Sequence, residues 1–137
     1  MNAKQWVIGT IVGGLVVFGA GWVLFEMLLG DYYAANAGSA TGLDKDPPIW
    51  WAVVVGALAY AALIIYAMRA QAASVNLISG MKVGAIVGFL IWATADFSLF
   101  GIANMSNLTL TVVDPLVELV RGGIAGAVLG ALLPKVA

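Results

Sequence analysis

VVDPLVELVRGGIAGAVLGALL, from Val112 to Leu133, is the stretch that decides the fold. A membrane-spanning helix needs about 20 apolar residues, and this stretch is long enough. It nevertheless carries Asp114, Glu118 and Arg121, which at roughly 100° per residue lie within about 60° of one another on a helix. An ionisable group at membrane depth costs about 2.5–3.5 kcal/mol on insertion scales, so other groups must compensate it. The stretch therefore predicts a membrane helix with a functional polar stripe.

The composition of the whole chain is typical of an integral membrane protein. Its 137 residues are 63% hydrophobic and 9% charged, whereas a soluble domain has about 25% charged residues. This length predicts a single transmembrane domain over residues 1–137. The net charge is −1 and like charges form no block, so nucleic-acid binding has no electrostatic basis.

Cysteine and histidine are both absent from the sequence. Disulfides, thiol chemistry, thiolate or imidazole metal ligands and histidine-activated nucleophiles are therefore excluded. A metal site would need oxygen ligands alone, which suit hard cations. Carboxylates without these partners leave few mechanisms, so we expect a protein that is not an enzyme and has no cofactor or metal centre.

Four apolar runs predict an all-α bundle of four transmembrane helices. They cover residues 5–29, 49–68, 77–100 and 109–133, and the one sizeable loop is residues 30–48. This loop and the start of the second helix carry aromatic residues that are either interfacial anchors or ordinary packing residues. They are Tyr32, Tyr33, Trp50 and Trp51.

The basic residues predict the orientation. Threading four helices puts four of them on one side: Lys4, Arg69, Lys82 and Lys135. The opposite loop has three aspartates and one lysine: Asp31, Asp44, Asp46 and Lys45. The positive-inside rule then puts both termini in the cytoplasm, and we expect a multi-pass protein of the bacterial inner membrane.

The two halves of the chain resemble each other weakly. Trp22–Glu26 (WVLFE) parallels Trp92–Asp96 (WATAD), and each follows a glycine-rich run. Pro48 and Gly56 have the same spacing as Pro115 and Gly123. One interpretation is a helical hairpin used twice. The alternative is chance, because sequences rich in Gly, Ala, Val and Leu align easily.

Two glycine ladders predict close helix packing, since small residues let helices approach each other in a membrane. The third helix contains Gly80, Gly84 and Gly88, and the fourth contains Gly122, Gly126 and Gly130. Packing within the chain is one role for these faces. Homo-oligomerisation, or docking of another membrane protein, is the other.

Depth along the helices brings three ionisable residues to one level. At a rise of about 1.5 Å per residue, Asp96 and Glu118 lie roughly 22 Å from the cytoplasmic end and Arg121 about 18 Å. Asp114 and Glu26 are nearer the outer interface, at roughly 28–30 Å. We therefore predict a polar network of Asp96, Glu118 and Arg121. Four further residues are expected nearby: Glu26, Asp114, Trp92 and Asn104.

Four carboxylates against one arginine leave an excess of negative charge, which a low-dielectric setting does not tolerate. Glu26 and Asp114 are expected to reach interfacial water. Three hypotheses remain for the rest of the network. In the first, the network is a structural staple: Arg121 pairs with Glu118 and Asp96 and fixes the register of the helices. In the second, it is a site for a proton, a cation or an amine-bearing ligand. In the third, it is a face that pairs with another subunit.

The Asp114–Pro115 step allows two descriptions of the fourth helix. Proline is favoured in the first turn of a helix and aspartate caps the residue before it, so the helix could begin at Pro115. Residues 109–113 would then be an interfacial strand or a re-entrant segment. A proline kink in a longer helix is the alternative.

Two segments are similar to small bacterial four-helix membrane proteins classed as domains of unknown function. They are GMKVGAIVGFLIWATADFSLFGIANMSNLTLTVVDPLVELVRGGIAGAVLGALL (residues 80–133) and GAGWVLFEMLLGDYY (residues 19–33). The resemblance covers nearly the whole chain, although its motifs are loose. It implies a four-helix fold and no activity, so it assigns no catalytic residue.

Overall fold

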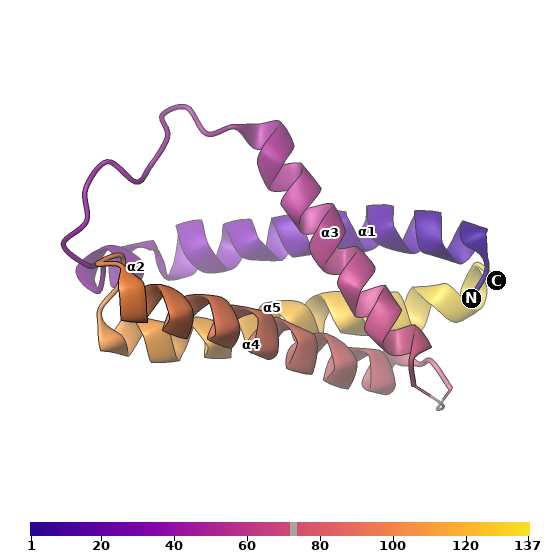
Figure 1. Ribbon diagram of the computed structural model, residues 1–137. Helices are drawn as coiled ribbons and strands as arrows, with labels where there is room; N and C mark the ends of the chain where they lie inside the picture. The colour runs from indigo at the N-terminus through magenta and orange to yellow at the C-terminus, as the bar shows by residue number, and fades with distance from the viewer. Residues whose placement is uncertain (72–73) are drawn as a thin grey trace.

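The computed structural model describes residues 1–71 and 74–137, and over these ranges the protein is helical (Figure 1). Four helical segments are long and apolar enough to cross a membrane, which fits a multi-pass membrane protein. They are Ala3–Leu28, Trp50–Arg69, Leu77–Ile102 and Leu108–Lys135. The prediction of four long apolar helices that form a helical bundle is confirmed.

Asparagine side chains cap the N-termini of three of the four long helices. Asn2 accepts a hydrogen bond from the backbone of Gln5 at the start of α1 (Ala3–Gly21), and Asn76 caps α4 (Leu77–Ile102) in the same way. Asn107 accepts from Leu110 N at 2.8 Å and begins α5 (Leu108–Leu132). Each cap satisfies an amide that the first helical turn would leave without a partner.

The description of the fourth helix as beginning at Pro115, with Asp114 as its cap, is wrong. Because Asn107 supplies the cap, α5 starts at Leu108, directly after the α4–α5 connection, and runs through Pro115 as a continuous helix. Residues 109–113 are helical rather than a strand or a re-entrant segment. Pro115 lies inside this helix and cannot donate a backbone hydrogen bond there.

The first span changes its winding towards its end. α1 is followed by a π-helix, η1 (Trp22–Leu28), in which Leu29 N donates to Leu24 O at 3.0 Å, a spacing of five residues. A short helix, α2 (Gly30–Ala35), occupies the start of the segment predicted to be a loop. The second long helix, α3, covers Trp50–Arg69.

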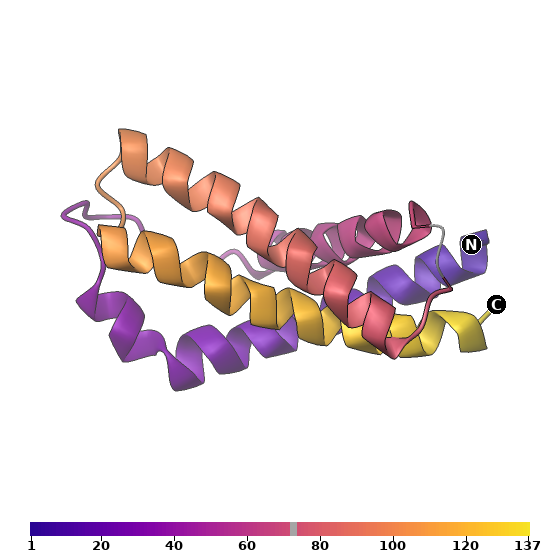
Figure 2. The same ribbon diagram turned by 90° about the horizontal axis from the view of Figure 1, so that it is seen from below.

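α5 lies at the centre of the bundle, and α4 packs along it (Figure 2). The two glycine ladders face each other in this pair. A Cβ atom added at Gly84 would lie 2.8 Å from Gly126 Cα, and one added at Gly80 would lie 2.8 Å from Gly130 Cα. Only glycine permits so close an approach of the two backbones.

The two ends of the chain lie side by side (Figure 1). The buried side chain of Gln5 donates from Nε2 to Leu133 O at 2.9 Å, which fixes the start of α1 against the end of α5. The terminal 3₁₀ turn, η2 (Leu133–Lys135), follows directly. The start of α4 and the end of α3 lie at the same end of the molecule (Figure 1).

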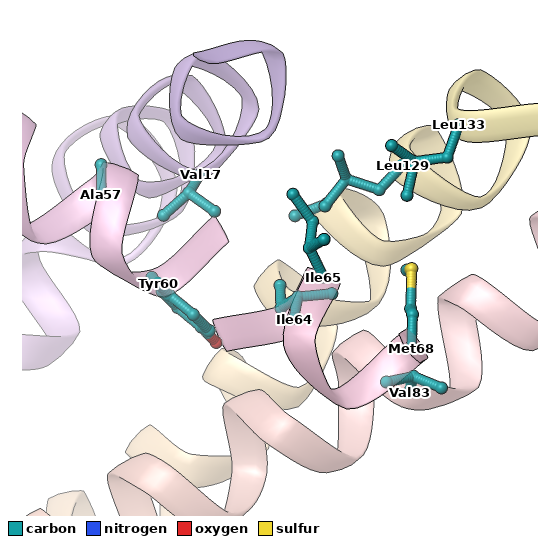
Figure 3. Close-up of a cluster of buried hydrophobic side chains, with 10 residues drawn as sticks. Val17, Ala57, Tyr60, Ile64, Ile65, Met68, Val83, Leu129 and Leu133 are labelled. Atoms are coloured by element: carbon teal, nitrogen blue, oxygen red, sulfur yellow. The ribbon is translucent and has the colours of Figure 1, made fainter. Parts of the chain in front are cut away.

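Apolar side chains from all four long helices meet in one core, shown in Figure 3. Ile64 and Ile65 from α3 are fully buried, as are Val17 from α1 and Leu129 from α5. Tyr60 belongs to this cluster (Figure 3), and its hydroxyl bonds to the Glu118 carboxylate. The core therefore ends where the polar groups begin.

Candidate functional site

The centre of the polar site is an ion pair within α5. Arg121 Nη1 lies 2.8 Å from Glu118 Oε1, and the Glu118 side chain is only 1% exposed. Tyr60 from α3 donates to the other carboxylate oxygen, Glu118 Oε2, at 3.2 Å. Both oxygens of this buried carboxylate therefore have a donor, as burial of a charge requires.

Arg121 is held by α1, η1 and α3 as well. Its Nε donates to Val17 O at 3.0 Å. The guanidinium lies 5.4 Å from the ring centre of Phe25 and 5.5 Å from that of Tyr60, so both aromatic rings stabilise the cation. Gly21 gives it room, because an added Cβ would lie 2.9 Å from Arg121 Nη2.

Asp114 is bonded to the short helix α2. The Tyr33 hydroxyl donates to Asp114 Oδ1, and the aspartate is 8% exposed. The expectation that Asp114 reaches interfacial water is therefore wrong, because α2 folds over it. Burial, followed by the hydrogen bond to Asp114, raises the pKa of Tyr33 above its usual range. Tyr33 also packs against Phe25, with ring centres 5.3 Å apart.

Asp96 on α4 has a different environment. Its carboxyl group neighbours that of Asp114. The Oδ2 atom is buried, and no protein group in residues 1–71 and 74–137 donates a hydrogen bond to it. Arg121 forms no ion pair with Asp96 within these ranges. The predicted staple thus includes Glu118 and Arg121 but leaves out Asp96.

These groups line one cavity of about 540 Å³ between α4, α5 and the η1–α2 segment. Asp96, Asp114, Glu118 and Arg121 form its polar wall. The apolar and aromatic lining includes Phe25, Tyr33, Trp92, Leu99, Met105 and Leu110. Glu26 also lines the cavity and is exposed to the surroundings, as is Met105, so the cavity is open at this end of the molecule.

The predicted site residues divide into two groups. Six of the seven line the cavity: Asp96, Glu118, Arg121, Glu26, Asp114 and Trp92. Asn104 does not line it, and its carbonyl instead accepts a hydrogen bond from Ala40 N at 2.9 Å. This bond and the Gly38 N to Met105 O bond hold the segment after α2 against the α4–α5 connection.

The sequence did not indicate the hydroxyl and the aromatic rings that contact the ion pair. Tyr60 and Phe25 sit in apolar runs that read as ordinary membrane helix, and no sequence signal separates them from lipid-facing aromatics. Thr111 is another buried residue of the cavity wall, and its hydroxyl donates to Asn107 O at 2.8 Å. Thr111 could have been predicted as a cavity residue, because it is a polar residue within a predicted membrane span.

Among the described residues, no three carboxylate side chains are arranged closely enough to hold a metal ion. No protein-family model, curated protein or solved structure matches this chain.

Proposed function

We propose that this protein is a membrane-embedded binding protein for a small organic cation that carries an amine. The ligand occupies the cavity between α4, α5 and the η1–α2 segment, and its ammonium group lies against Asp96. The observation that carries this proposal is the buried Asp96 Oδ2 atom, which has no protein donor among the described residues although it belongs to a cavity wall.

The charges of the cavity support a cationic ligand. Arg121 is the single basic residue of the lining, and it is already paired with Glu118. Asp114 accepts a hydrogen bond from the neutral Tyr33 hydroxyl, which supplies no charge. Asp96 and Asp114 are therefore neighbouring carboxyl groups without a counter-charge, and ionising both in a low dielectric is unfavourable because like charges repel each other. A bound ammonium group removes this repulsion and donates to Asp96.

The walls of the cavity favour an organic ligand over a hydrated inorganic ion. Phe25, Tyr33 and Trp92 present aromatic surface, which attracts an ammonium group and packs against an apolar body. The volume of about 540 Å³ is in the range of small-molecule sites. An apolar amine meets both requirements with one molecule.

The setting that we propose is the bacterial inner membrane, with both termini in the cytoplasm. Lys4, Arg69, Lys82 and Lys135 support this orientation through the positive-inside rule. Because the chain has no cysteine, single cysteines introduced at Ser39 and Ala137 report the two sides without background. In intact cells, a membrane-impermeant maleimide should label Ser39→Cys and leave Ala137→Cys unlabelled. The reverse pattern would overturn the orientation.

Ligand binding is tested with 2-phenylethylamine as the probe. Its uncharged analogue 2-phenylethanol and the anion phenylacetate have the same ring and serve as controls. We expect calorimetry on the detergent-solubilised protein to detect binding of the amine alone. Asp96→Asn removes the carboxylate while keeping its shape, so it should weaken amine binding at least tenfold.

The matched control variant is Asp31→Asn, which removes the same charge from an exposed position outside the cavity. It should bind the amine as the unmodified protein does. Equal binding of amine and alcohol, or unchanged amine binding by Asp96→Asn, would contradict the proposal. Asp96→Asn should also keep the unfolding temperature within a few degrees of that of the unmodified protein, which excludes a folding defect as the cause.

A further inference from the structure

A second hollow of the surface lies along α4 and α5, away from the acidic cavity. Its first part has a volume of about 520 Å³ and includes Met81, Lys82 and Ile124. The second part, of about 340 Å³, includes Leu77 and Lys135. The two parts share Ala127 and Val128, so they form one groove, which we call the α4–α5 groove.

The groove exists because the side chains next to the glycine ladder are small. Ala85, Gly123 and Ala127 are too small to fill the space between the two helices, whereas Met81 and Val128 are larger and form its sides. A Cβ atom added at Gly123 would meet nothing closer than 3.6 Å, so this position has room. The groove lies within the lengths of α4 and α5 that are apolar enough to cross a membrane.

The charges that border the groove are all positive. Lys82 and Lys135 are both exposed, and neither forms an ion pair within the described part of the chain. Among the described residues, no acidic side chain lines either part of the groove. Lys82 is five residues after the first residue of α4, which puts its Cα roughly 8 Å into the span. Its long side chain reaches back towards the headgroup level.

An anionic phospholipid matches both properties of this surface. An acyl chain covers the apolar groove, and a headgroup phosphate neutralises the two ammonium groups. A second copy of this chain matches poorly, because a two-fold interface through the same surface would bring Lys82 and Lys135 of both copies together. Basic pockets between membrane helices are known settings for anionic headgroups.

We infer that the α4–α5 groove binds one acyl chain of an anionic phospholipid, whose phosphate is held by Lys82 and Lys135. This binding is independent of the acidic cavity. It gives the end of the molecule that carries both termini a preferred lipid neighbour.

The test compares the unfolding temperature of the whole protein in nanodiscs of dioleoylphosphatidylcholine with and without 20% dioleoylphosphatidylglycerol. We expect phosphatidylglycerol to raise the unfolding temperature by several degrees, and native mass spectrometry to detect a retained phosphatidylglycerol molecule. The double variant Lys82→Gln/Lys135→Gln should lose both effects. Gly123→Leu, which places a side chain in the groove and keeps both lysines, should also lose the retained lipid.

The matched control is Lys4→Gln/Arg69→Gln, because it removes two exposed positive charges from the same end of the molecule but outside the groove. It should keep the retained lipid and the temperature shift. Equal loss in this control would show general attraction to anionic membranes and overturn the groove site. Equal stabilisation by both lipids, or a dimer abolished by Gly123→Leu and indifferent to phosphatidylglycerol, would overturn it as well.

Discussion

Arg121 and Glu118 lie one helical turn apart on α5 and form an ion pair of 2.8 Å. The pairing partners are local in sequence, yet the other groups that hold them come from other elements. Val17 of α1 and Tyr60 of α3 contribute hydrogen bonds, and Phe25 of η1 contributes a ring. The pair therefore links α5 to three elements that surround it.

Removal of one member of this pair should be more damaging than removal of both. Arg121→Met leaves the carboxylate of Glu118 buried without its cation, and breaking a buried pair in this way costs about 3–5 kcal/mol. The double variant Glu118→Gln/Arg121→Met removes the charge as well and should recover much of that loss. Free energies of unfolding in detergent check the prediction. Purely additive losses would contradict it.

The glycine contact between α4 and α5 should not tolerate a methyl group. Gly84→Ala places a Cβ 2.8 Å from Gly126 Cα, so the helices must separate, and we expect a loss of about 1–3 kcal/mol. Gly101→Ala is the control on the same helix, because nothing lies within 4 Å of the added Cβ. This control should be neutral or stabilising by up to about 1 kcal/mol. Thermal unfolding of the two variants separates the outcomes.

The hydrogen bond from Tyr33 to Asp114 should hold α2 on the bundle. Tyr33→Phe leaves the Asp114 carboxylate without this donor, and an unsatisfied buried group costs about 1–3 kcal/mol. Amide hydrogen exchange over residues 30–36 should become faster. Tyr32→Phe is the control, since no side-chain hydrogen bond to the Tyr32 hydroxyl is present in the described structure. Similar exchange in both variants would show that packing alone holds α2.

Alkaline pH should weaken the contribution of Tyr33. Burial and the hydrogen bond to Asp114 raise the pKa of Tyr33 in the folded protein, whereas an unfolded tyrosine titrates near about 10. The stabilisation is therefore fully present below about pH 10 and is lost as the pH rises further, because only the unfolded chain releases the proton. The difference in unfolding temperature between the unmodified protein and Tyr33→Phe should shrink between pH 9 and 11. A constant difference would contradict this linkage.

The secondary structure could be predicted because its signals are local. Apolar runs and asparagine caps depend on neighbouring residues, so the four spans lie within three residues of their predicted bounds. The π-winding of Trp22–Leu28 and the short helix Gly30–Ala35 could not be predicted in this way. η1 and α2 contain Phe25 and Tyr33, whose contacts with Arg121 and Asp114 are set by helices distant in sequence.

The candidate site was predicted in part for the same reason. The distance of a residue along its helix depends only on the rise per residue, and this distance predicted that Asp96, Glu118 and Arg121 lie at similar depths. This distance does not say how a helix is rotated about its axis in the bundle, or which other elements cover a side chain. Asp114 was expected near water, but α2 covers it. One of the three hypotheses paired Arg121 with both Glu118 and Asp96, and the structure has only the Glu118 pair among the described residues, with Val17 O as a further acceptor.

The sequence by itself determined that four helices are long and apolar enough to cross a membrane, and which ionisable residues those helices carry, because hydropathy and helical rise are properties of each segment alone. Only the tertiary structure decided which carboxylate has a partner and which does not. That choice depends on packing, since a hydrogen bond needs a donor within about 3 Å, and Tyr60, the second donor to Glu118, and Tyr33, the donor to Asp114, come from helices far away in the chain. Among the residues that the structure describes, Asp96 Oδ2 is the buried carboxylate oxygen left without one.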